Sequence, residues 1–295
     1  MLRRMGLVLI VFVGAISSTG TARAVADAAG GRGVIEVFPG PGALKDALAS
    51  ANAGDVLNIH TGTYPEHVAV TTPDLTLRSA GDGEVTVDAG CSASTTIDVR
   101  ADGTTIRGLR VVGASGGFSP IEINFGHVAT GRVLSSVVED TCGDAEYGVN
   151  VFSSQTIRVV GNTATGFGDA GIYIGAILST QRGPLVIQGN ESYGNVRGII
   201  VENSAGGTIR VTGNDVHDNQ TTGIWITNSD GVRVDGNLAQ DNNYSGIELD
   251  SLSDQNLIKA NTASGHRYDL ANDAGATGNC WVDNVYATSL GNISC

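Results

Sequence analysis

Aromatic and acidic residues recur at fixed distances after a series of glycines in the second half of the chain. Two or four residues after those glycines stand Asn150, Tyr173, Trp225, Glu248, Glu202 and Asp250. Aromatic rings stack on the apolar faces of sugars and polar side chains bond to sugar hydroxyls, so a groove needs few such groups to orient a ligand. We therefore interpret Tyr173, Trp225 and Asn150 as candidate ligand-binding residues for an extended carbohydrate.

The three acids are candidates for catalysis. Glu248 and Asp250 are two residues apart, which separates their backbones by roughly 6.5–7 Å in a strand. Glu202 and Asp250 would lie roughly 9–10 Å apart if their segments were strands two layers apart in a stack. Inverting glycosidases separate their two carboxyl groups by about 6.5–9.5 Å. The spacing thus allows Glu202, Glu248 and Asp250 to be catalytic, although exposed acids on an acidic protein also serve solvation alone.

A repeat positions these residues. Gly-Asn occurs at 161–162, 189–190, 213–214 and 236–237, with Ala-Asn at 260–261, so the successive intervals are 28, 24, 23 and 24 residues. Self-similarity at a fixed period in this range predicts a solenoid. The segments between the marks alternate apolar and polar residues with period two, which indicates strands. We expect Ile172, Ile199, Ile224 and Ile247 to pile up inside the coil, and their sequence neighbours to face solvent.

Two further columns follow from the same alignment. The repeated asparagines are expected at inward corners, where side-chain amides hydrogen-bond from one layer to the next. Arg158, Arg210 and Arg233 form a second outward column. Arginines there could hold uronate carboxylates or act as the base of a lyase, or they could simply keep the surface soluble.

The units GIIVENS, GIWITNS and GIELDSL resemble the right-handed parallel β-helix of the pectin-lyase-like superfamily. The stretch GDVLNIHTGTYPEHVAV, residues 54–70, resembles the first turn of several such families, among them pectin methylesterases and the NosD group of periplasmic copper-chaperone-associated proteins. We predict an all-β, single-stranded right-handed parallel β-helix of roughly 11 rungs in one domain, residues 27–295. A capping helix is expected at residues 41–52 and a C-terminal closure at residues 280–295.

The catalytic motifs of the related enzymes do not carry over. The methylesterase Asp-Phe-Ile-Phe-Gly segment and the polygalacturonase Asn-Thr-Asp and Gly-His-Gly segments do not occur, and the epimerase Tyr-Gly-x-Asp-Pro-His segment stops after Tyr147-Gly148. The five histidines are scattered among different repeats, so we expect no metal ligands and no cofactor. Calcium at the acidic stretch around Glu139-Asp140 is conceivable, but no motif supports it.

The N-terminal segment of the chain predicts export. Residues 1–26 have the charged start, short apolar run and small-residue end of a secretory signal peptide. Cleavage after Ala26 would remove three of the 17 basic residues, all of them arginines. The remaining 14 basic and 30 acidic residues would give the mature protein a net charge of −16. We therefore expect a secreted or cell-envelope protein without a membrane span and without a nucleic-acid partner.

The four cysteines, in an exported chain, predict two disulfides. Of the three possible pairings we favour Cys91 with Cys142 and Cys280 with Cys295. Three functions remain open: binding of polysaccharide on the outer face, a polysaccharide lyase, epimerase or hydrolase, and a NosD-like maturation or adhesion scaffold. The sequence leaves the oligomeric state undetermined.

Overall fold

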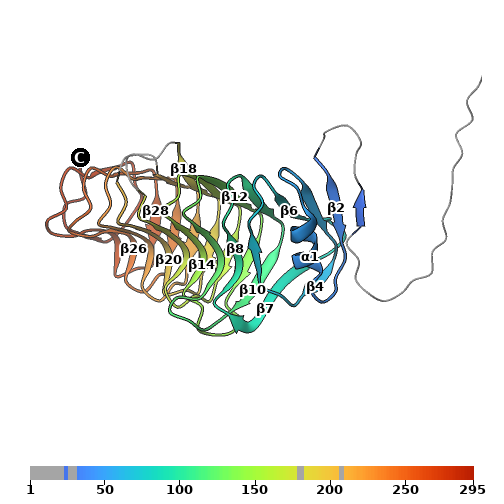
Figure 1. Ribbon diagram of the computed structural model, residues 1–295. Helices are drawn as coiled ribbons and strands as arrows, with labels where there is room; N and C mark the ends of the chain where they lie inside the picture. The colour runs from blue at the N-terminus through green and yellow to red at the C-terminus, as the bar shows by residue number, and fades with distance from the viewer. Residues whose placement is uncertain (1–22, 26–31, 178–182, 206–208) are drawn as a thin grey trace, which may run out of the picture.

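The computed structural model describes residues 23–25, 32–177, 183–205 and 209–295, and these form one coil of parallel strands (Figure 1). Each turn of the coil contributes one strand to each of three sheets, so strands three apart in the chain are neighbours in a sheet. The predicted parallel β-helix is thus confirmed, with about ten turns where the sequence suggested roughly 11. The expected signal peptide, residues 1–26, lies outside the described residues except for Arg23–Val25.

Sheet A contains twelve strands among the described residues, all parallel except for the antiparallel β1–β2 pair. Its strands are β1 (Arg23–Val25), β2 (Val34–Val37), β3 (Val56–Ile59), β6 (Thr76–Ser79), β9 (Thr104–Arg107), β12 (Thr130–Leu134), β15 (Thr156–Val160), β18 (Leu185–Gln188), β21 (Ile209–Thr212), β24 (Arg233–Asp235), β27 (Leu257–Lys259) and β30 (Cys280–Val282).

Sheets B and C complete each turn. Sheet B consists of β4 (Gly62–Tyr64), β7 (Val85–Ala93), β10 (Arg110–Ala114), β13 (Val137–Glu139), β16 (Thr163–Thr165), β19 (Glu191–Tyr193), β22 (Asp215–His217), β25 (Leu238–Gln240) and β28 (Thr262–Ser264). Sheet C consists of β5 (Val68–Val70), β8 (Thr95–Val99), β11 (Ile121–Gly126), β14 (Tyr147–Phe152), β17 (Ala170–Gly175), β20 (Arg197–Glu202), β23 (Thr222–Thr227), β26 (Ser245–Leu249), β29 (Tyr268–Asn272) and β31 (Ser289–Leu290).

The core is a vertical stack of branched aliphatic side chains. Ile172, Ile199, Ile224 and Ile247 are paired in register on successive strands of sheet C, and all are fully buried. The expected inward pile is confirmed. The glycine before each isoleucine has a steric cause, because a Cβ on Gly198 would stand 2.6 Å from the carbonyl oxygen of Gly223 in the next turn.

Stacked asparagines line two corners of the coil, as predicted. Between sheets A and B, the Oδ1 of Asn190 accepts hydrogen bonds from both the backbone N–H and the side-chain amide of Asn162, each at 2.9 Å. The same pair of bonds continues through Asn214, Asn237, Asn261 and Asn284. A second ladder between sheets B and C joins Asn195, Asn219 and Asn242. These bonds satisfy buried amides that would otherwise carry a large desolvation cost.

A short helix, α1 (Ala43–Ser50), covers the N-terminal end of the coil (Figure 1). Its residues Ala43, Leu44 and Ala47 are buried against the first turns. The helix has no side-chain cap of its own, but the Glu66 carboxylate accepts the backbone N–H groups of Leu44 at 2.9 Å and Lys45 at 3.0 Å. A carboxylate at this position satisfies free N–H groups and complements the helix dipole.

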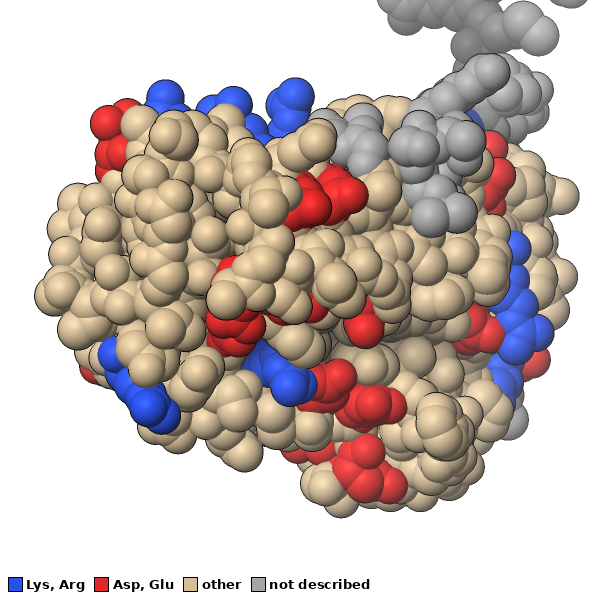
Figure 2. Space-filling view, turned by 90° about the vertical axis from the view of Figure 1, so that its left-hand side faces the viewer, with Lys and Arg blue, Asp and Glu red and all other residues tan. Residues whose placement is uncertain are grey.

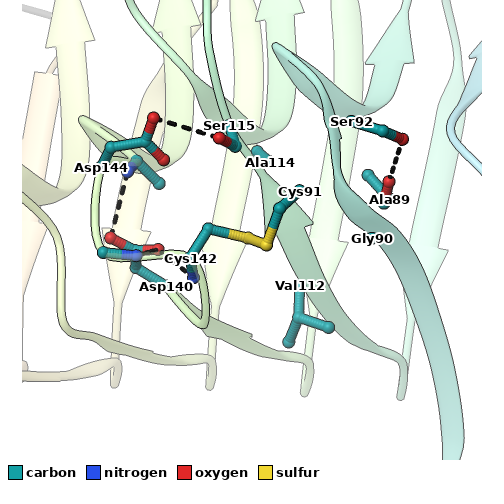
Figure 3. The surroundings of a disulfide bond; sticks show 12 residues. Ala89, Gly90, Cys91, Ser92, Val112, Ala114, Ser115, Asp140, Cys142 and Asp144 are labelled. Atoms are coloured by element: carbon teal, nitrogen blue, oxygen red, sulfur yellow. Dashed lines mark hydrogen bonds between the residues drawn. A yellow bond between two sulfur atoms is a disulfide. The ribbon is translucent and has the colours of Figure 1, made fainter.

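Two disulfides form with the favoured pairing, Cys91 to Cys142 and Cys280 to Cys295. The first joins the projecting end of β7 to the loop after β13 (Figure 3). Asp140 holds that loop, because its carboxylate accepts the backbone N–H groups of Cys142, Gly143 and Ala145 at 2.8–3.0 Å. In the acidic stretch that suggested calcium, the Asp140 carboxylate therefore binds the backbone of its own loop.

Candidate functional site on the outer face of sheet C

The structure places the candidate residues on neighbouring strands of one sheet face. The register aligns Asn150 of β14 with Tyr173 of β17, Tyr173 with Ile200 of β20, Ile200 with Trp225 of β23, and Trp225 with Glu248 of β26. Adjacent strands in a sheet lie about 4.8 Å apart. The candidates therefore form a row along the coil axis on the side opposite the isoleucine pile.

An apolar cluster occupies the middle of this row. Ala170, Tyr173 and Ile200 pack together outside the core, and Tyr147 and Trp225 pack against them. We call Tyr147, Tyr173 and Trp225 the aromatic patch. Tyr173 is only 8% exposed and Ile200 only 1%, because their neighbours on the adjacent strands cover them. The patch thus presents mainly Tyr147 and Trp225 to solvent, with Tyr173 beneath.

Carboxylates hold the two tyrosines of the patch. The Tyr147 and Tyr173 rings lie 4.6 Å apart between centroids. The Tyr147 hydroxyl donates to Asp169 Oδ2 at 3.1 Å, and the Tyr173 hydroxyl donates to Glu202 Oε2 at 2.7 Å. Burial, reinforced by these carboxylates, raises the pKa of both phenols above the ordinary value of tyrosine. Both hydroxyls are therefore neutral hydrogen-bond donors at physiological pH.

Trp225 is held differently. The Arg197 guanidinium carbon lies 4.6 Å from the centre of the indole ring, and the same guanidinium pairs with Asp169. The indole N–H of Trp225 has no hydrogen-bond acceptor among the described residues. A cation over an indole face is attractive, whereas a shielded N–H without a partner is costly. The ring is therefore fixed by packing and by Arg197 alone.

The three acidic candidates have distinct surroundings. Glu202 accepts only the Tyr173 hydroxyl, so in the described residues its second oxygen is without a partner. Glu248 accepts the hydroxyls of Thr222, at 3.0 Å, and Ser245. Whether any of the three acids is catalytic remains a hypothesis from the sequence.

Asp250 fixes the turn after β26. It accepts the Thr227 hydroxyl at 2.6 Å, the Ser253 hydroxyl at 2.7 Å, and the backbone N–H groups of Asn228 and Leu252. Burial favours the neutral acid, but these hydrogen bonds outweigh it and lower the pKa of Asp250. A carboxylate held in this way is poorly suited to carry a proton at neutral pH.

Asn150 belongs to a polar row that continues toward the N-terminus. Its amide donates to Asn124 Oδ1 at 2.7 Å, and the Asn124 amide donates to Asp98 Oδ1 at 2.9 Å. Asn150 is 8% exposed. It therefore borders the aromatic patch, with one of its two amide N–H groups already used within the protein.

Sequence reasoning did not select Tyr147, Asp169 or Arg197. Tyr147 and Arg197 stand directly before Gly148 and Gly198. A Cβ added to either glycine would point into the coil and meet buried atoms. The preceding residue therefore faces outward, beside the row two positions after the glycine. The repeat therefore indicates that the residue before each glycine faces outward. This can be inferred only if both the glycine and the apolar residue after it are known to point into the coil.

The described residues contain no group of three or more His, Cys, Asp or Glu side chains that could hold a metal ion. Their cysteines are all in disulfides. His266 is buried and bonded to Asp269 Oδ1 at 3.0 Å, while His60 lies between Glu36 and Asp82 on opposite ring nitrogens. The described part of the chain also lacks any helix with the length and hydrophobicity to cross a bilayer.

Solved structures share the fold at low sequence identity. A complex of XylC with xylose has a TM-score of 0.64 at 12% identity, covering 84% of this chain and 69% of that one. The Dettilon tailspike protein gp208 has a TM-score of 0.53 at 19% identity, covering 82% of this chain and 56% of the tailspike. The A-module of the Azotobacter vinelandii mannuronan C-5 epimerase AlgE6 has a TM-score of 0.50 at 17% identity, covering 85% and 90%. These similarities show the fold alone.

Comparison with curated protein sequences finds no match. A family model described as "Periplasmic copper-binding protein (NosD)" matches residues 88–293, well over half of the chain. The match begins within β7 and includes every strand from β8 onward. With its parallel β-helix, its stacked asparagines and this match, the chain belongs to the NosD family.

Proposed function

We propose that this protein is a binding protein of the cell envelope that holds an extended carbohydrate along the outer face of sheet C. The family is described as periplasmic, and disulfides form in oxidising compartments outside the cytoplasm. The expected signal peptide points the same way. Copper does not enter this proposal, because the described residues offer neither a cluster of metal ligands nor a free thiol.

The aromatic patch carries the proposal. Its rings come from β14, β17 and β23, which span three strand steps of about 4.8 Å each. Its two more exposed members, Tyr147 and Trp225, are thus about 14 Å apart along the axis, a span of roughly three sugar units of an extended chain. Aromatic side chains lose little conformational entropy on binding, and here Asp169, Glu202 and Arg197 already hold them in place.

Polar groups beside the rings would orient the ligand. The oxygen of Glu202 that has no partner among the described residues can accept a sugar hydroxyl. One solved structure of the same fold is a complex with xylose. Binding without catalysis requires nothing more of these residues.

The test is retention of the protein by neutral polysaccharides in affinity electrophoresis. Trp225→Ala should weaken binding roughly tenfold, because it removes aromatic stacking area from the patch. Tyr286→Ala is the matched control, since Tyr286 is 41% exposed and lies outside the patch. If no polysaccharide retards the wild-type protein, or if both variants bind equally well, the proposal fails.

A further inference from the structure

Sheet A carries three pairs of arginines on its outer face. The register aligns Arg78 with Arg107, Arg132 with Arg158, and Arg210 with Arg233, all at outward positions of strands from β6 to β24. The last two pairs share one column, interrupted by Val186, and the first pair lies two positions further along its strands. We call these six residues the basic stripe, and all six are exposed. In Figure 2, which views the C-terminal end of the coil, basic side chains project from the upper edge, where sheet A lies in Figure 1.

The stripe concentrates positive charge on an acidic protein. The whole chain has 17 basic and 30 acidic residues, yet the outward positions of the described sheet A strands contain only two carboxylates, Glu36 and Asp235. Within the described residues, Arg233 is the only member of the stripe with an ion-pair partner, Asp235 at 2.6 Å. Arginines kept only for solubility in an acidic chain would be expected to pair with the abundant acids. Among the described residues the other five guanidinium groups form no ion pair, and one of them, Arg78, donates its Nε–H to Asn58 Oδ1 at 3.1 Å.

Two surface hollows lie along the same stripe. One, of about 340 Å³, is lined by Arg32, Arg132 and Arg158, by Thr76 and Thr105, and by one acid, Asp74, so that its three arginines outnumber its single carboxylate. The other, of about 450 Å³, is lined by Arg78 and Arg107. The lining of the first hollow also includes the backbone of Gly103 and Gly131. The stripe is therefore indented, so that a ligand could sit between the guanidinium groups.

We propose that the basic stripe binds a linear polysaccharide bearing carboxylates, on a face separate from the aromatic patch. Guanidinium groups match carboxylates with paired hydrogen bonds. From β6 to β24 the stripe spans six strand steps, about 29 Å at 4.8 Å per step. One step is close to the length of one sugar unit, so two neighbouring uronate groups can meet the two arginines of a pair, and a longer chain can reach more than one pair. Threonine hydroxyls in the hollow offer further partners to sugar hydroxyls.

Single-stranded nucleic acid is the main competing polyanion. Proteins that bind it stack bases on aromatic side chains set in the positive groove. None of the described residues lining the two hollows is aromatic. The net negative charge does not prevent local binding, because charges on the other faces are screened beyond about 10 Å in 0.1 M salt. The stripe thus favours a carboxylated glycan.

The experiment measures binding of the full-length protein to oligogalacturonate by calorimetry and by affinity electrophoresis. The variant Arg132→Ser with Arg158→Ser should bind about tenfold more weakly, at two lost charge pairs of up to about 1 kcal/mol each. Wild-type binding should also fall between about 0.1 M and about 1 M salt, because the screening length shortens from about 10 Å to about 3 Å. The substituted arginines are exposed, so the variant should fold, and thermal melting is the measurement that checks this.

The control variant is Arg100→Ser with Arg267→Ser, which removes the same charge from exposed positions outside sheet A. It should keep wild-type affinity. Equal losses in the two variants, or no loss in either, would overturn the proposal. Equally tight binding of single-stranded DNA to the stripe would overturn the assignment to a polysaccharide. Trp225→Ala should leave oligogalacturonate binding intact, so failure at sheet C and failure at sheet A are distinguishable.

Discussion

Glu122 stands where the later turns of the coil place a glycine. Its neighbours Ile121 and Ile123 pair with Tyr147 and Val149, so Glu122 aligns with Gly148. The side chain is fully buried, and Glu122 accepts the Ala114 N–H at 3.0 Å and contacts the Thr96 hydroxyl at 2.6 Å. Burial, only partly offset by these hydrogen bonds, raises the pKa of Glu122 to about 7. The protonated acid is therefore the form that the fold favours.

This pKa predicts a pH dependence of stability. A carboxyl group whose pKa rises from 4.5 to about 7 on folding stabilises the fold fully below pH 4.5, and the contribution disappears as the pH rises through about 7. Wild-type stability should fall by up to about 3 kcal/mol between pH 4.5 and pH 8. Glu122→Gln keeps a hydrogen-bonding side chain without the charge and should remove most of this fall.

Urea unfolding at several pH values measures this difference. The exposed Glu84 supplies the control, since Glu84→Gln should keep the wild-type pH profile. A Glu122→Gln profile that falls as steeply as the wild-type profile would show that Glu122 is not the group responsible.

At the scale of elements, the asparagine ladders connect each turn to the next. Asn237 accepts the backbone N–H and amide of Asn214, donates to the Val211 carbonyl at 2.9 Å and donates to Asn261. These asparagines are buried at the corners between strands of only three or four residues. The corners are therefore held as firmly as the strands, which explains how such short strands keep their register.

Removing one ladder asparagine should destabilise the coil. Asn237→Ala leaves the N–H and amide of Asn214 and the carbonyl of Val211 unsatisfied inside the protein, at a cost of about 2–4 kcal/mol. Chemical unfolding followed by circular dichroism measures the loss. Asn243→Ala is the matched substitution of an exposed asparagine one residue from the other ladder, and it should change stability by less than about 0.5 kcal/mol. Similar losses of stability in the two variants would show that the ladder contributes no more to stability than an exposed asparagine does.

At the scale of the whole molecule, the coil presents two faces with different chemistry. Sheet C shows aromatic rings and carboxylates, and sheet A shows exposed arginines. Because each turn adds one strand to each face, the same kind of outward side chain can recur on successive strands along the axis. A solenoid is suited in this way to long, regular ligands.

The disulfides act on this scale as well. Cys91–Cys142 closes a 51-residue separation across more than one turn, while Cys280–Cys295 closes 15 residues at the C-terminus. Loop-closure entropy predicts about 4 kcal/mol for the first and about 3 kcal/mol for the second. Replacing Cys91 and Cys142 with serine should therefore cost more in urea unfolding than replacing Cys280 and Cys295. The reverse order would show that anchoring the C-terminal tail matters more than loop length.

The sequence by itself determined the coil, the inward isoleucines and the stacked asparagines, and it favoured the disulfide pairing that the structure has, whereas the third strand of each turn appeared only in the structure. Each turn repeats the same local requirements, so residues such as Ile199 and Asn214 identify their own positions. Tertiary structure decided which outward side chains are accessible and what they contact. Tyr173 lies beneath its neighbours, Asp250 holds a turn, and Arg197 covers Trp225. Outward positions have no repeated packing requirement, so their surroundings depend on side chains from adjacent turns, which only the folded chain brings together.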